Sequence, residues 1–122
     1  MKWFGKSSKS AKDEAAEARK FERIEFFQSS FYTDKEITHE CWFNNISLGG
    51  LCFDTNSGDL SLEDTIKILY KIGIKIRNDM CVLRYKTKAL NNWRYGCEFI
   101  TPDEQRDEMI RMYVQEHVLK AN

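Results

Sequence analysis

Long hydrophobic runs, net charge and proline are scarce or absent in this 122-residue sequence. No apolar stretch approaches the ~18 residues that a bilayer-spanning helix needs. The basic start at Met1–Lys6 is not followed by the apolar core of a signal peptide. The 19 basic side chains are balanced by 19 acidic ones, so bulk positive charge for coating a nucleic acid is missing. The sequence therefore predicts one cytoplasmic domain, and disfavours a membrane protein, a secreted protein and a nucleic-acid-binding protein.

The spacing of a metal site is also missing. The four cysteines form no Cys-x-x-Cys pair, and their gaps match no zinc framework. By number alone they can form two disulfides, but without a secretion signal we expect reduced, mostly buried thiols. We therefore expect neither a metal nor a cofactor. The cysteines are Cys41, Cys52, Cys81 and Cys97.

Motifs of catalysis are lacking as well. There is no glycine-rich phosphate loop before a helix and no His-Glu-x-x-His. The only candidate nucleophiles are Cys97 and Ser47, and neither has a base nearby in the sequence. A strand through His39, Glu40 and Cys41 places the first and third side chains on one face and Glu40 on the other. We therefore expect no enzyme activity.

The charge that is present is distributed unevenly. Residues 1–23 carry seven basic and four acidic side chains, a net charge of 7 − 4 = +3, whereas residues 102–122 carry three basic and five acidic ones, a net charge of 3 − 5 = −2. A basic segment on a neutral body suits a small anionic ligand or an anionic surface. A solvated tail is the simpler interpretation for residues 1–10, and membrane contact through Trp3 and Phe4 is a further alternative.

The middle of the chain is predicted to be β. Apolar and polar residues alternate over short segments that are separated by turn signals, and no alternation of strands with helices indicates a parallel sheet. This pattern favours a sandwich or a small barrel. We expect the fifth strand to bulge or turn near Asn78-Asp79. The strands are expected at residues 24–30, 36–44, 51–55, 65–72, 74–88 and 93–100, with turns at 45–50, 56–58 and 91–92.

Two helices are predicted, one at each end. The segment Thr101-Pro102-Asp103-Glu104 resembles a capping box with Thr101 as N-cap, which predicts a helix over residues 102–120. Residues 9–22 are rich in helix formers but have little apolar surface, so that helix is expected to be marginal. The apolar face of the C-terminal helix is expected to comprise Ile110, Tyr113, Val114, His117, Val118 and Ala121.

A pair of arginines, Arg19 and Arg23, lies four residues apart where the N-terminal helix is expected to meet the first strand. Guanidinium groups suit bidentate recognition of phosphate and of the O6/N7 edge of guanine. Taken alone, Arg-x-x-x-Arg is a weak motif, and a solvated pair near Glu22 and Glu25 is the more common explanation.

A second motif lies at the end of the second expected strand. Asn45 and Ser47 are two residues apart and therefore point the same way, offering an amide and a hydroxyl to a base edge. Gly49 and Gly50 let the chain turn and let a ligand approach closely. The ordinary alternative is an Asx turn between two strands.

Together, in this order and followed by strands, the two motifs resemble those of the PilZ domain family, the bacterial receptors for cyclic di-GMP. The Arg-x-x-x-Arg of the family is similar to Arg19 and Arg23, and its [Asp/Asn]-x-Ser-x-x-Gly is similar to Asn45, Ser47 and Gly50. Asn occupies the first position of the second motif, where Asp is also common, and it can still accept a hydrogen bond from a guanine N–H.

The resemblance extends over most of the chain. The segment Trp93–Phe99 is similar to the aromatic–Gly–x–Glu–Phe ending of the family, before a helix led by acidic residues. It implies a mainly β fold, a six-stranded antiparallel barrel at residues 24–100 with a C-terminal helix, and no catalysis. The PilZ domain is then expected at residues 18–122, whereas residues 1–17 have no counterpart and are expected to form a basic, mobile extension.

The resemblance also implies a ligand and a mechanism. Cyclic di-GMP has two phosphates and two guanines, and its binding is expected to order the arginine arm and signal through an unidentified protein partner, in the control of motility, pili, biofilm or virulence. The alternative is an interaction protein of the same fold that works without nucleotide. The expected ligand-binding residues are Arg19, Arg23, Asn45, Ser47 and Gly50, with Gly49 leaving room for a base and Lys20 adding long-range charge.

Overall fold

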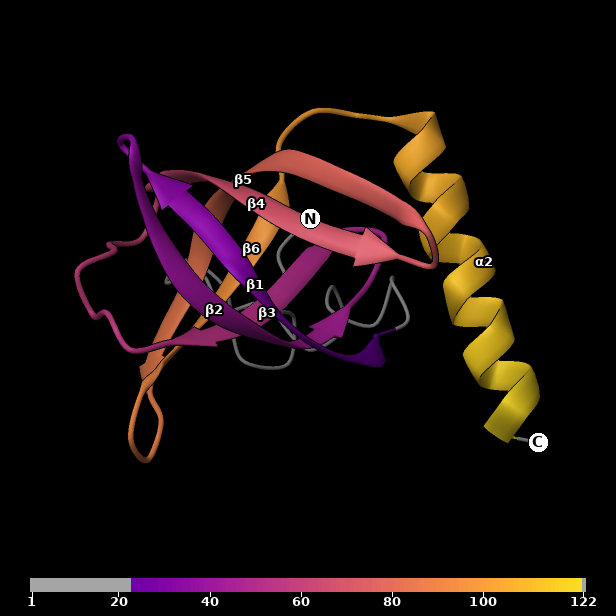
Figure 1. Ribbon diagram of the computed structural model, residues 1–122, viewed down its shortest axis with the longest axis horizontal. Helices are drawn as coiled ribbons and strands as arrows, with labels where there is room; N and C mark the ends of the chain where they lie inside the picture. The colour runs from indigo at the N-terminus through magenta and orange to yellow at the C-terminus, as the bar shows by residue number, and fades with distance from the viewer. Residues whose placement is uncertain (1–22, 122) are drawn as a thin grey trace, which may run out of the picture.

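The computed structural model describes residues 23–121, which form a closed antiparallel barrel with a helix at one end (Figure 1). The strands follow one another around the barrel in the order β1-β2-β3-β6-β5-β4. The fold expected from the sequence is therefore confirmed, while the expected helix at 9–22 and the extension at 1–17 lie outside the described residues. The elements are β1 (Ile24–Asp34), β2 (Ile37–Ile46), β3 (Gly50–Thr55), β4 (Thr65–Ile72), β5 (Lys75–Lys88), β6 (Trp93–Phe99) and α2 (Glu104–Ala121).

Alternation along each strand fills the barrel interior. In β4, Ile66, Ile68 and Tyr70 are buried, while Lys67, Leu69 and Lys71, which alternate with them, are exposed. Aromatic rings from different strands stack inside. Phe53 lies 5.6 Å from Tyr95, centroid to centroid, and Phe26 lies 5.6 Å from Phe43. All four cysteines are buried in this core, and burial raises the pKa of the Cys41 thiol to about 12.

Closure of the barrel between β1 and β4 relies partly on side chains. The backbones pair only over Phe31–Thr33 and Lys67–Leu69. Beyond this, the Gln28 amide donates to the carbonyl of Lys71 (2.9 Å) and its oxygen accepts from the Lys71 N–H (2.8 Å). A side-chain amide has the same donor and acceptor as a peptide group, so Gln28 continues the ladder where the backbones separate.

A bulge in β2 extends that strand past its predicted end. Phe43 pairs with Phe53 and Asn45 with Cys52, which leaves Asn44 as an extra residue opposite β3. The extra residue shifts by one the positions that face the barrel interior. Ile46 is therefore buried, although an unbroken alternation of inward and outward side chains would place it outside. The prediction that the turn begins at Asn45 was wrong for this reason.

The expected break in β5 is also absent from the structure. Asn78 and Asp79 pair regularly with Leu69 and Ile68 inside one continuous strand, and the irregularity lies between Leu83 and Tyr85 instead. Turn-forming residue types were therefore misleading here, because regular pairing with β4 outweighs their local preference.

Helix α2 begins two residues later than predicted. The Asp103 carboxylate accepts from the Arg106 backbone N–H at 3.0 Å, and the Asp103 carbonyl accepts the first helical hydrogen bond, from Asp107 (3.0 Å). Asp103 is therefore the N-cap, and the assignment of Thr101 to that position was wrong. No helix in the described part of the chain is both long and apolar enough to cross a membrane.

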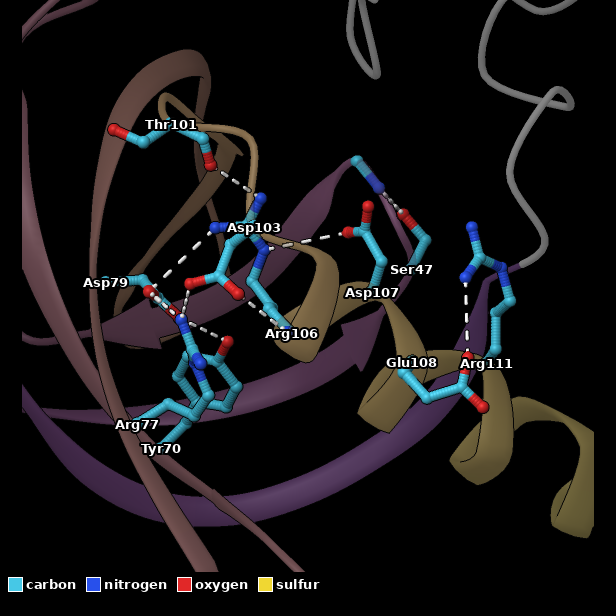
Figure 2. Close-up of polar contacts among 11 residues, drawn as sticks. Ser47, Tyr70, Arg77, Asp79, Thr101, Asp103, Arg106, Asp107, Glu108 and Arg111 are labelled. Atoms are coloured by element: carbon cyan, nitrogen blue, oxygen red, sulfur yellow. Dashed lines mark hydrogen bonds and ion pairs between the residues drawn. The ribbon is translucent and has the colours of Figure 1, made fainter.

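A network of charged side chains fixes the start of α2 to the barrel (Figure 2). Arg77 on β5 donates from Nη2 to Asp79 (2.7 Å) and to the N-cap residue Asp103 (2.5 Å). The Tyr70 hydroxyl on β4 donates to the same Asp79 carboxylate at 2.5 Å. Burial alone raises the pKa of Asp79, but these hydrogen bonds outweigh it and the pKa is lowered.

Arg106 makes the second attachment of α2. Its side chain is only 6% exposed, and its guanidinium lies 4.2 Å from the centroid of the Phe99 ring. It also donates to the Thr101 carbonyl at 2.8 Å. Arg77 and Arg106 together hold the first turn of α2 against the ends of β4, β5 and β6 (Figure 2).

Candidate ligand-binding site

Strand register brings the two sequence motifs to the same end of the barrel. Ile24 at the start of β1 pairs with Ile46 at the end of β2, and Glu25 pairs with Asn45. Because the strands are antiparallel, Arg23 occupies the position opposite Ser47, one step beyond the last pair. The two motifs are far apart in the sequence, but the register brings Arg23 of the first close to Asn45 and Ser47 of the second, at the β2–β3 turn. Arg19 and Lys20 lie outside the described residues.

Ser47 is fully buried and its hydroxyl shapes the turn. Its Oγ accepts from the Gly49 N–H at 3.2 Å, and its own N–H donates to the Gly50 carbonyl at 2.9 Å. The turn is joined to β6 because the Phe99 N–H donates to the Gly49 carbonyl at 3.0 Å. Ser47 therefore fixes the backbone that any ligand at this end would meet (Figure 2).

The side chain of Asn45 has a hydrogen-bond acceptor that no described residue uses. Its Oδ1 is buried and accepts no hydrogen bond from a described residue. A buried amide oxygen that accepts no hydrogen bond lowers the stability of the fold by about 1–3 kcal/mol. We therefore expect a bound molecule to supply the missing donor. The N1–H and N2–H groups of a guanine are donors of the kind that this oxygen needs.

Gly50 is required by close packing between strands. A Cβ built there would lie 1.9 Å from the carbonyl oxygen of Cys97 on β6, far inside any allowed contact. From the sequence, the paired glycines were expected to allow a turn and the approach of a ligand. The structure gives Gly50 a different reason, the close approach of β3 to β6.

Helix α2 lies beside this site. The Tyr113 hydroxyl donates to the Glu25 carbonyl at 3.0 Å, and the Tyr113 ring packs edge-on against Phe26 at 5.4 Å. A cavity of about 370 Å³ separates Leu48 of the β2–β3 turn from Arg111 and other residues of α2. A ligand at the turn therefore has α2 as a neighbour.

The sequence and fold have matches among known proteins. A family model for the PilZ domain matches residues 17–116 of the chain. The chain belongs to the PilZ domain family. PilZ domains are receptor and effector domains, in keeping with the lack of catalytic motifs in this one. No curated protein matches the sequence.

Two solved structures resemble this PilZ domain in fold. One is the Bacillus subtilis inhibitor of motility (MotI/DgrA), with a TM-score of 0.72 and 13% identity, covering 84% of this chain and 52% of that one. The other is K. pneumonia MrkH in a complex with c-di-GMP, with a TM-score of 0.67, 14% identity and the same coverage. The chain thus spans about half the length of each of these proteins.

The charged network that attaches α2 to this PilZ barrel was not predicted from the sequence. The sequence did contain a signal. Arg77 and Asp79 alternate along β5 in step with the buried Cys81 and Leu83, so all four side chains lie on the inward face. Charged residues on an inward phase require partners. The sequence did not identify those partners, because Tyr70 and Asp103 come from other elements. Among residues 23–121, no three His, Cys, Asp or Glu side chains gather as a metal site would require.

Proposed function

We propose that this PilZ domain is a receptor for cyclic di-GMP, which it binds without catalysis at the barrel end formed by Arg23 and the β2–β3 turn. The observation that carries this proposal is the strand register, which sets Arg23 opposite Ser47 and two residues from the Glu25–Asn45 pair. Support also comes from the family match and from MrkH, whose structure is that of a c-di-GMP complex.

The chemistry of the ligand matches the groups at this end. Arg23, together with Arg19 from the preceding segment, supplies guanidinium groups for phosphate oxygens and the O6/N7 edge of guanine. The buried Oδ1 of Asn45 accepts from guanine N–H donors. Ser47 holds the turn, Gly50 lets β3 pack closely on β6, and the lack of a side chain at Gly49 leaves room for a base. Lys20 contributes long-range charge.

Ligand binding fixes residues 18–23 against the barrel in this proposal. Ordering about five residues costs on the order of 5–10 kcal/mol of backbone entropy. Several charge-assisted hydrogen bonds of about 1.5–3 kcal/mol each, with stacking on guanine, offset that cost. The result is a moderate affinity that falls as salt screens the arginine–phosphate contacts.

The signal passes from the turn to α2. The Gly49 carbonyl is bonded to Phe99, and the Phe99 ring is covered by Arg106 of α2. A downstream protein that reads the position of α2 or of the arginine arm would then sense the ligand. The name of MotI, an inhibitor of motility, makes motility one process to examine first.

Calorimetry with purified cyclic di-GMP tests this proposal. Arg23→Ala is expected to weaken binding by about thirtyfold or more, because loss of one buried charge-assisted contact costs about 2–5 kcal/mol. Asn45→Ala is expected to weaken it as well. Arg94→Ala is the matched control, since Arg94 is an exposed arginine on β6 that is bound to Asp54 (2.8 Å), away from the turn.

Three results would count against the proposal. The wild-type protein does not bind cyclic di-GMP, Arg23→Ala binds it with unchanged affinity, or Arg94→Ala weakens it as much as Arg23→Ala. The first result would favour an interaction protein that works without nucleotide. Amide hydrogen exchange tests the ordering separately, because Ala18–Arg23 should exchange more slowly only with ligand present.

A further inference from the structure

The turn between β4 and β5 exposes apolar side chains where polar ones are usual. Ile74 at its tip is 93% exposed, and Ile76, the second residue of β5, is 69% exposed. Gly73 adopts a positive φ of 62°, which lets the chain turn tightly at this point. The hairpin therefore projects two isoleucines into solvent at the same end of the barrel as α2 (Figure 1).

A groove runs between this hairpin and α2. One part has a volume of about 820 Å³ and extends along the first turns of α2. The other part, about 410 Å³, continues past the tip of the hairpin. Lys75, Met109 and Met112 line both parts, so the two form one continuous helix–hairpin groove. Methionine is common on surfaces that bind other proteins because its side chain adapts to a partner.

The two walls of the helix–hairpin groove carry opposite charges. On the helix wall, the exposed Glu104, Glu108 and Glu116 outnumber one exposed base, Arg111, which lies 3.7 Å from Glu108. On the hairpin wall, the basic side chains are the exposed Lys75 and the half-buried Arg77. The groove thus has apolar side chains in both parts, a mainly acidic helix wall and a basic hairpin wall.

We propose that the helix–hairpin groove is the contact surface between two copies of this chain. A two-fold axis along the groove lays the helix wall of each copy over the hairpin wall of the other. Each Ile74 and Ile76 then meets methionines of the second copy, and each Lys75 meets a row of glutamates. The protein carries no net charge, so no long-range repulsion opposes the contact. Nucleotide plays no part in it.

Sedimentation velocity on the full 122-residue chain, without nucleotide, tests the proposal. The wild-type protein is expected to form a dimer as its concentration rises. Ile74→Asp is expected to weaken the dimer by about a hundredfold or more, because two buried isoleucines are lost per dimer. Leu90→Asp is the matched control. Leu90 is also 93% exposed, but it lies in the β5–β6 turn at the opposite end of the barrel.

Charge exchange tests the arrangement of the two walls. Lys75→Glu and Glu108→Lys are each expected to weaken the dimer, and the double variant is expected to restore it. Far-ultraviolet circular dichroism checks that each variant is folded. A wild-type protein that stays monomeric up to several hundred micromolar overturns the proposal. So does a dimer that survives Ile74→Asp, one that Leu90→Asp dissociates, or one that the double charge exchange does not restore.

Discussion

Replacement of Asp79 by asparagine should expose how strongly α2 is held to the barrel. Asp79 accepts hydrogen bonds from Arg77 Nε (3.0 Å), from Arg77 Nη2 (2.7 Å) and from the Tyr70 hydroxyl (2.5 Å). The side chains of Asp79 and Arg77 are 11% and 15% exposed. The neutral amide of Asp79→Asn leaves the Arg77 guanidinium without this carboxylate in a largely buried position.

The magnitude follows from the remaining contacts. Breaking a buried ion pair by removing one partner costs about 3–5 kcal/mol. Arg77 is partly solvated and keeps its contact with Asp103 at 2.5 Å, so we expect a loss nearer to about 2–3 kcal/mol. For a domain of this size, about 1 kcal/mol corresponds to a shift of roughly 4–8 °C in the thermal midpoint.

Urea unfolding followed by circular dichroism at pH 7 measures this loss. Asp54→Asn is the control. Asp54 is nearly as buried (14% exposed), but its partner Arg94 is 44% exposed, so no guanidinium is left unpaired in a buried position and we expect a loss of about 0–1 kcal/mol. A loss below about 0.5 kcal/mol for Asp79→Asn, within the scatter of ordinary surface changes, would refute the reasoning.

Acid offers an independent check on the same carboxylate. The folded protein lowers the pKa of Asp79, so its contribution to stability is present above the ordinary pKa of an aspartate and is lost as the pH falls through the lowered value. The wild-type protein and Asp79→Asn should therefore differ most near neutral pH. Their stabilities should converge in acid, below the lowered pKa.

Two further changes test local features of the fold. Asp103→Ala should lower the thermal midpoint by several degrees, because Asp103 caps α2. Thr101→Ala should leave the midpoint almost unchanged. Equal effects of the two variants in differential scanning calorimetry would mean that Asp103 is not the N-cap. Gly50→Ala should destabilise the barrel by roughly 1–3 kcal/mol in urea, because the added methyl overlaps the Cys97 carbonyl. An unchanged urea midpoint for Gly50→Ala would mean that β3 can move away from β6 without cost.

The sequence predicted those strands whose alternation is uninterrupted. The bounds of β4 agree with the prediction, since Ile66, Ile68 and Tyr70 alternate with exposed residues from end to end. The end of β2 was not predicted because the bulge at Asn44 reverses which side chains face inward. The residue types around Asn44 do not reveal that one residue of the strand is unpaired. β1 also continues past its expected end at Ser30, to Asp34, through its pairing with β2.

The candidate site was predictable in part for a similar reason. Motif spacing identified Arg23, Asn45 and Ser47, and the register between β1 and β2 brings these positions together. The internal bond from Gly49 to the Ser47 hydroxyl and the true cap at Asp103 were not predictable. The cap is also bonded to Arg77, 26 residues away, and sequence patterns do not reveal such a contact.

The side-chain closure at Gln28 also bears on how the barrel is protected from pairing with strands of other chains. Where the backbones of β1 and β4 separate, the N–H and carbonyl of Lys71 form a short stretch of sheet edge, and such edges recruit strands from other chains. The Gln28 amide occupies both groups. Gln28 therefore removes the hydrogen-bonding positions that an aggregating strand would use, and Gln28→Ala would open them at the one joint where the barrel has the fewest backbone pairs.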